Sequence, residues 1–139
     1  MRLVVDTNLL VSALLAGASL PAHLVTLWRA GRFDLLTSAE QLDEIARVTR
    51  YPHIRARLSP ALAGRLVNDI RELAVMLDHL PRVDTSPDAN DNYLLAMARA
   101  GAADFLVTGD KRDLLSLHRF HNSRIVTVRT LLVLSRMLP

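Results

Sequence analysis

The sequence predicts an α/β domain of three layers, in which a central parallel sheet of four to five short strands is flanked by helices. Short apolar runs at residues 2–5 and 104–108 are typical of strands that are buried on both faces of a parallel sheet. Segments with helical patterns separate these runs, which indicates βα units. The chain has 139 residues, of which 50% are hydrophobic and 22% charged. This length and composition predict one ordered domain over residues 1–139.

The first half of the chain is expected to contain two strands and three helices. The strands are predicted at residues 2–5 and 33–37, and the helices at residues 8–16, 20–30 and 39–49. Gly17 and Gly31 follow the first two helices, where glycine commonly ends a helix. Ser38 is a suitable N-cap for the third helix.

The second half begins with a helix break at Pro52. Ser59 followed by Pro60 marks the start of the next helix, which is expected to continue to about residue 78. The remaining elements are an irregular stretch at 81–87 with a brief strand at 82–83, a helix at 90–100 ended by Gly101, strands at 104–108 and 124–128, and a final helix at 130–137.

Composition and charge narrow the class of protein. Cysteine is absent, which excludes disulfides and thiolate metal sites such as zinc fingers. The net charge is +3, and Lys111 is the only lysine. Arginine pairs bidentately with phosphate, so the arginine bias favours a nucleic-acid partner, although a GC-rich genome also raises arginine content.

The longest charge-free stretch, residues 7–28, does not have the pattern of a membrane span. Gly17, Ser19 and Pro21 interrupt it, whereas a spanning helix needs about 20 mostly apolar residues without such breaks. No basic segment precedes a cleavable apolar core. We therefore expect a cytoplasmic protein that does not associate with a membrane.

Four acidic residues lie where a parallel sheet places its ligands, beyond the carboxyl ends of the strands. Asp6 closes the first strand, and Asp110 follows the strand at 104–108 by two residues. Asp91 lies near the start of a helix, and Glu44 lies within the helix after the second strand. Taken singly, each has a structural explanation: Asp6 as an N-cap, Asp91 at a helix start, and Glu44 in an ion pair with Arg47.

Taken together, these carboxylates indicate a metal site. Several carboxylates at one edge repel one another unless a cation neutralises them. Oxygen ligands without cysteine suit the hard ions Mg²⁺ or Mn²⁺. On an arginine-rich protein, such a site suggests hydrolysis of phosphodiester bonds.

The motifs around these acids resemble a known family. Four segments, VVDTNLLVSALL, LLTSAEQLDEIARVTRYPHIRARL, PDANDNYLLAMARAGAADFLVTGDKRDLL and RIVTVRTLL, resemble in order the segments of PIN-domain proteins. The most similar group is that of bacterial toxins of toxin–antitoxin pairs, related to the VapC ribonucleases. The resemblance covers nearly the whole chain.

This resemblance implies an endoribonuclease that depends on Mg²⁺ or Mn²⁺ and hydrolyses RNA phosphodiester bonds. By motif position, the catalytic and metal-binding acids are Asp6, Glu44, Asp91 and Asp110, with Glu44 acting directly or through a water molecule. Supporting polar groups fall at Asn8, Thr108 and Asp113. The implied partners are the RNA substrate, a small cognate antitoxin protein and a second copy in a homodimer.

The chain departs from the common family pattern at two places. The segment TGDKRDLL is one residue longer than the frequent form, which leaves the exact role of Asp113 open. Asn90 stands where relatives often carry another acid, which leaves open whether Asp88 approaches the metal. Arg50, Arg55 and Arg57 are candidates for gripping RNA phosphates. A merely solvated loop is the other interpretation of these arginines.

The same residues argue against other classes of enzyme. A dehalogenase-like phosphatase needs a second aspartate where Asn8 stands, and a receiver domain needs a lysine placed differently from Lys111. His118 and His121 have no third ligand nearby and are expected to lie in an irregular loop. A catalytically weak or inactive PIN-fold module that binds RNA or an antitoxin is the alternative in a different class.

Overall fold

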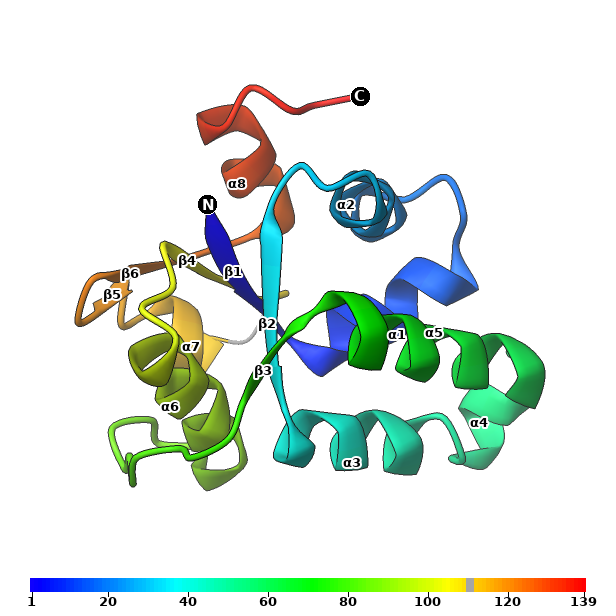
Figure 1. Ribbon diagram of the computed structural model, residues 1–139, viewed down its shortest axis with the longest axis horizontal. Helices are drawn as coiled ribbons and strands as arrows, with labels where there is room; N and C mark the ends of the chain where they lie inside the picture. The colour runs from blue at the N-terminus through cyan, green and yellow to red at the C-terminus, as the bar shows by residue number, and fades with distance from the viewer. Residues whose placement is uncertain (110–111) are drawn as a thin grey trace.

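The computed structural model describes residues 1–109 and 112–139, and its centre is a twisted sheet (Figure 1). Its six strands in the described residues are β1 (Arg2–Val5), β2 (Asp34–Ser38), β3 (Val75–Leu77), β4 (Phe105–Val107), β5 (Arg119–Phe120) and β6 (Ser123–Val126). The strand order is β3-β2-β1-β4-β6-β5, with parallel pairing throughout except between β5 and β6. The predicted fold class is confirmed, and the sheet has more strands than the four to five expected.

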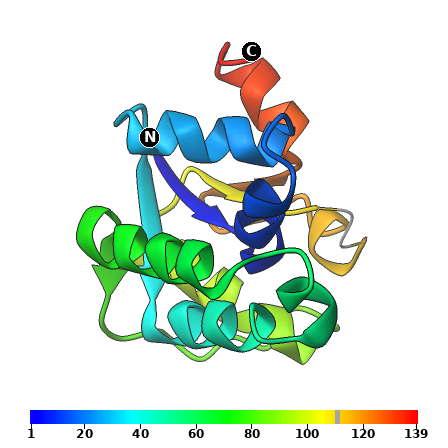
Figure 2. The ribbon, with the colours of Figure 1, turned by 90° about the vertical axis from the view of Figure 1, so that its right-hand side faces the viewer.

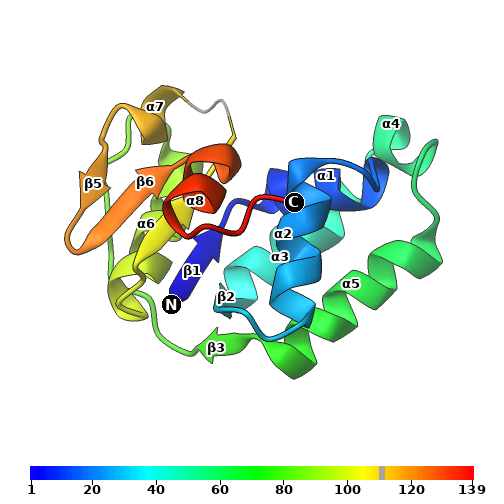
Figure 3. The ribbon, with the colours of Figure 1, turned by 90° about the horizontal axis from the view of Figure 1, so that it is seen from above.

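Helices cover both faces of this sheet. They are α1 (Thr7–Leu15), α2 (Leu20–Arg29), α3 (Ala39–Val48), α4 (Pro52–Arg55), α5 (Pro60–Leu73), the 3₁₀ turn η1 (Ala89–Asp91), α6 (Asn92–Ala100), α7 (Arg112–Leu115) and α8 (Val128–Leu134). Seen from above, α6 and α7 lie on one side of the sheet and α1, α2, α3 and α5 on the other (Figure 3). The strands therefore form the middle layer of three.

Alternation along β1 divides the core into two clusters. Leu3 and Val5 pack in the cluster under α1, α2, α5 and α8, whereas Val4 packs in the cluster under α6. All three side chains are almost fully buried. An apolar strand without a polar face is therefore what this position in the sheet requires.

Local signals set several boundaries as predicted. The Ser38 side chain accepts a hydrogen bond from the backbone of Gln41 and caps α3, and Ser59 caps α5 with Pro60 in the first turn. Gly101 is the C-cap of α6. A Cβ at this position would overlap the side chain of Leu36, so any larger residue here would force that buried side chain to shift.

The structure corrects three expectations. The helix expected to run to residue 78 ends at Leu73, because Ala74 is extended and Val75–Leu77 pairs with β2 as β3. Residues 82–83 form no strand. His118 and His121 lie beside and within the β5–β6 hairpin, both with positive φ, rather than in an irregular loop.

Within the described residues, no single helix is long and apolar enough to span a membrane. Among the helices that the structure describes, α1 and α2 pass that test of length and composition as a pair, and they are bent by 100° relative to one another.

Candidate active site

Asp6 lies at the carboxyl end of β1 and is only 1% exposed. Its backbone N–H donates to the Val107 carbonyl of β4 across 2.9 Å, which continues the pairing of the two strands. The backbone N–H of Asn8 donates to Asp6 Oδ1 across 3.2 Å, and the Thr108 hydroxyl donates to Oδ2 across 2.9 Å. Asp6 is thus the N-cap of α1, and Thr108, itself fully buried, fixes its second oxygen.

A buried amide ties helix α3 to the end of β1. The Gln41 side chain is fully buried, and its Nε2 donates to the Val5 carbonyl across 2.7 Å. Its Oε1 accepts a hydrogen bond of 2.9 Å from the Thr37 hydroxyl. Glu44 follows Gln41 by nearly one helical turn, so this contact holds Glu44 on the side of α3 near Asp6.

The Tyr93 hydroxyl connects Glu44 to the first residue of α1. It donates to Glu44 Oε1 across 2.5 Å and lies 3.1 Å from the Thr7 hydroxyl. Arg47 Nη2 lies 3.6 Å from the other carboxylate oxygen of Glu44. Tyr93 therefore brings α1, α3 and α6 together beside Asp6.

The phenol of Tyr93 stays a neutral donor. Burial is the main cause that raises the pKa of Tyr93 above its ordinary value, and the hydrogen bond to the Glu44 carboxylate raises that pKa further. The nearby negative charge of Asp6 acts in the same direction. Tyr93 can thus orient Glu44 without adding a negative charge to the site.

Asp91 ends the 3₁₀ turn η1 and is only 2% exposed. The turn is held from both sides: Asp88 accepts a hydrogen bond from the backbone of Asn90, and the Asn92 side chain accepts one from the backbone of Ser86. Asp88 is exposed and acts as the cap of this turn. A buried carboxylate at Asp91 therefore sits two residues before Tyr93.

The other predicted site residues are placed differently. Asp110 lies outside the described residues. The side chains of Asn8 and Asp113 are exposed, and Asn8 contacts Asp6 through its backbone alone among the hydrogen bonds described. Over residues 1–109 and 112–139, no three His, Cys, Asp or Glu side chains form a group that could hold a metal ion.

Sequence reasoning missed Gln41 and Tyr93. Gln41 stands next to Leu42 in the buried stripe of α3, where a polar residue is unusual and signals a buried partner. Tyr93 follows Asp91 at the start of α6, on the apolar face that packs in the core beside Leu94. That position favours a core residue on sequence grounds, and only the fold shows what its hydroxyl reaches.

Comparison with known proteins shows the family of the chain. The family model described as PIN domain matches residues 2–112, so the chain belongs to the PIN-domain family. No curated protein sequence matches the chain.

Among solved structures, the fold is similar to a chain of the crystal structure of VapBC2 from Rickettsia felis bound to a DNA fragment from their promoter. The TM-score is 0.58 and the identity is 16%, over 91% of this chain and 98% of that chain. At this identity, the similarity shows the shared fold.

Proposed function

We propose that this PIN-domain protein is an endoribonuclease that depends on Mg²⁺ or Mn²⁺ and acts in the cytoplasm as the toxin of a toxin–antitoxin pair. One observation carries the proposal: Asp6, at the carboxyl end of β1, and Asp91, two residues before Tyr93, are almost fully buried carboxylates, and the Tyr93 hydroxyl links Glu44 to Thr7 beside Asp6. Burial of ionised carboxylates is costly, and a bound cation offsets part of that cost beside the hydrogen bonds that the protein supplies.

The donor chemistry of these residues fits a hard divalent cation. Carboxylate oxygens are its preferred protein ligands, and no softer ligand type enters the set. Asp6 and Asp91 would bind the cation directly together with Asp110. Glu44 already uses its oxygens toward Tyr93 and Arg47, so we assign it to act through water rather than as a direct ligand.

The residues around the cation would orient the groups that take part in hydrolysis. When bound, the cation stabilises negative charge on the phosphodiester and lowers the pKa of water. Thr108 fixes Asp6 Oδ2, and Tyr93 fixes Glu44 Oε1. Glu44 Oε2, the carboxylate oxygen that Tyr93 does not bind, would accept a proton from the attacking water, and Arg47 Nη2 lies 3.6 Å from this oxygen.

We propose two protein partners for this chain, an antitoxin and a second copy of the chain. The similar structure is of VapBC2 on promoter DNA, which supports a small cognate antitoxin for this chain. We also propose a homodimer in solution. The alternative is a PIN-fold module that binds RNA or the antitoxin without cleaving RNA.

The test is cleavage of RNA by purified protein with Mg²⁺ or Mn²⁺, repeated with a chelator. We expect metal-dependent cleavage that leaves a 5′-phosphate, and loss of cleavage in Asp6→Asn and Asp91→Asn. Glu44→Gln should lower the rate strongly, whereas the neighbouring Asp43→Asn should not, because Asp43 is exposed and forms no described side-chain contact. Full-rate cleavage by Asp6→Asn would refute the metal assignment, and binding of RNA without cleavage would favour the inactive module.

A further inference from the structure

An open groove of about 380 Å³ lies between α3 and α5, away from the acidic site. The two helices run side by side, with α4 at one end (Figures 1 and 2). On α3 the groove is lined by Ala46 and Thr49, which lie across the helix from Glu44 at 100° per residue. The groove is therefore a separate surface from the candidate metal site.

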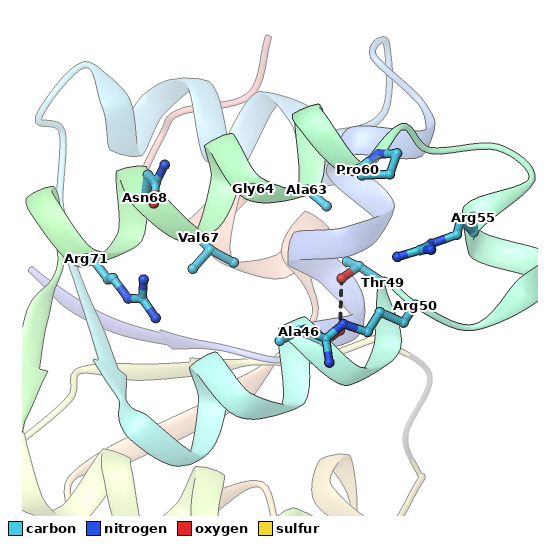
Figure 4. A pocket seen from close by; sticks show the side chains of 10 residues that line it. All are labelled: Ala46, Thr49, Arg50, Arg55, Pro60, Ala63, Gly64, Val67, Asn68 and Arg71. Carbon is cyan, nitrogen blue, oxygen red and sulfur yellow. Dashed lines mark hydrogen bonds between the residues drawn. The ribbon is translucent and has the colours of Figure 1, made fainter.

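Three arginines converge on this groove. Figure 4 shows Arg71 reaching from α5 toward α3, and Arg50 and Arg55 reaching in from the end of α3 and from α4. No acidic residue is among the described residues that line it. Within the described part of the chain, none of the three side chains has an ion pair or a hydrogen bond.

The floor of the groove lets a ligand backbone come close. Ala63 and Gly64 of α5 face Ala46 across it, and these residues have minimal side chains. A Cβ added at Gly64 would meet no atom within 4 Å, so the space above this helix is open. An open groove with small side chains on its floor and three guanidinium groups around it matches an extended polyanion.

Exposed rings next to the arginines favour a nucleic acid over an acidic peptide. Tyr51 and His53 stand between Arg50 and Arg55 in the chain, with ring centroids 6.0 Å apart, and Tyr51 is 40% exposed. Aromatic rings stack on unpaired bases, whereas the carboxylates of an acidic peptide offer no ring for stacking. Planar guanidinium groups bind phosphate bidentately.

We propose that the groove between α3 and α5 binds the sugar–phosphate backbone of single-stranded RNA through Arg50, Arg55 and Arg71. The choice of RNA rests on the proposed function. The structure thereby separates Arg55, which lines the groove, from Arg57, which does not. It also adds Arg71, which lies far from both in the sequence.

The test is the affinity for a short fluorescein-labelled single-stranded RNA, measured by fluorescence anisotropy in a chelator so that no cleavage occurs. Each phosphate contact to a single strand contributes about 0.7 to the slope of log Kd against log salt concentration. Arg50→Gln, Arg55→Gln and Arg71→Gln should each lower that slope by about 0.7, which weakens binding about fivefold at 0.1 M salt. The triple variant should lower the slope by about 2.

Two matched controls remove the same charge outside the groove. Arg65→Gln changes an exposed residue of α5, and Arg57→Gln changes the exposed arginine two positions after Arg55. Both should bind RNA as the wild type does. Gly64→Glu adds an acid into the open space of the groove and should weaken binding at least as much as one arginine loss.

Several results would overturn the proposal. If the control substitutions weaken RNA binding as much as the groove substitutions do, the effect comes from net charge alone. If the triple variant binds RNA with wild-type affinity, the groove is not the RNA-binding site. If the triple arginine variant loses binding to an oligoglutamate peptide but binds RNA as the wild type does, the groove is a peptide site. Equal dependence of duplex DNA binding on these arginines would refute the single-strand assignment.

Failure of the groove proposal and failure of the nuclease proposal give different results. RNA binding that depends on the three arginines, without cleavage in Mn²⁺, rejects only the nuclease. If the protein cleaves RNA and its RNA affinity does not change when the three arginines are replaced, only the groove proposal is rejected.

Discussion

Replacement of Tyr93 by phenylalanine removes one hydroxyl at the junction of three helices and keeps the ring. A hydrogen bond to a charged group contributes about 1.5–3 kcal/mol. The Glu44 side chain is 21% exposed, so water replaces part of the lost bond and the low end applies. The buried Thr7 hydroxyl also loses its partner, and together we expect a loss of about 2 kcal/mol in the free energy of unfolding.

The assay combines thermal unfolding with single-turnover cleavage of RNA. For a domain of this size, about 2 kcal/mol corresponds to a fall in Tm of about 6 °C. Cleavage should fall by about 10- to 100-fold at a temperature where the variant is fully folded, because Glu44 loses its fixed orientation. The affinity for RNA should stay unchanged.

Ser123→Ala is the matched control for the lost hydroxyl. Ser123 is buried and donates to the Ala103 carbonyl across 2.6 Å, in a part of the sheet away from Glu44. This variant should lose about 1–2 kcal/mol of stability and cleave at the wild-type rate. If Tyr93→Phe is destabilised but cleaves RNA at full rate, Tyr93 has only a structural role and the reasoning on Glu44 is wrong.

Two further predictions concern the framework that holds the site. Gly101→Ala should lower the free energy of unfolding by about 1–3 kcal/mol, measured by urea titration, because the added Cβ would overlap the Leu36 side chain. Gly64→Ala places its Cβ in open space on a helix and should raise the free energy of unfolding by about 0.5–1 kcal/mol. Equal effects of the two substitutions would contradict the packing account. Gln41→Leu should cost about 2–4 kcal/mol, since it leaves the Thr37 hydroxyl and a backbone carbonyl without partners, and adding Thr37→Val should recover part of that loss. Additive losses in the double variant would mean that the two side chains do not act as a unit.

Much of the fold follows from local sequence signals. Strand β1 occupies the predicted residues, because an apolar run ended by Asp6 is both a buried strand and a helix cap. Ser38 and Ser59 cap their helices because their side chains satisfy free backbone N–H groups. These signals act over three or four residues and need no knowledge of the remaining chain.

Elements that depend on distant partners were predicted less well. The run from Ala74 to Leu77 is apolar enough for helix or strand, and its pairing with β2 decides the outcome. The short β5 forms only as the hairpin partner of β6. Tertiary pairing, rather than local propensity, sets both strands.

In the candidate site, too, local sequence signals identify some residues, whereas contacts with distant residues place the others. Asp6 and Asp91 could be chosen from their positions after a strand and before a helix, and both are buried carboxylates in the structure. Glu44 could not be chosen by periodicity, because Gln41 and Tyr93 place it through contacts with residues far away in the chain. The position of Gln41 in an apolar stripe signals a buried partner, but the sequence does not say which partner, and only the fold shows it.

The central claim, that Asp6 and Asp91 share a divalent cation, is tested most directly by anomalous diffraction from crystals soaked in Mn²⁺. We expect an anomalous peak about 2.1 Å from a carboxylate oxygen of each residue. A peak elsewhere on the protein, or clear density for both carboxylates with no peak between them at saturating Mn²⁺, would contradict the account.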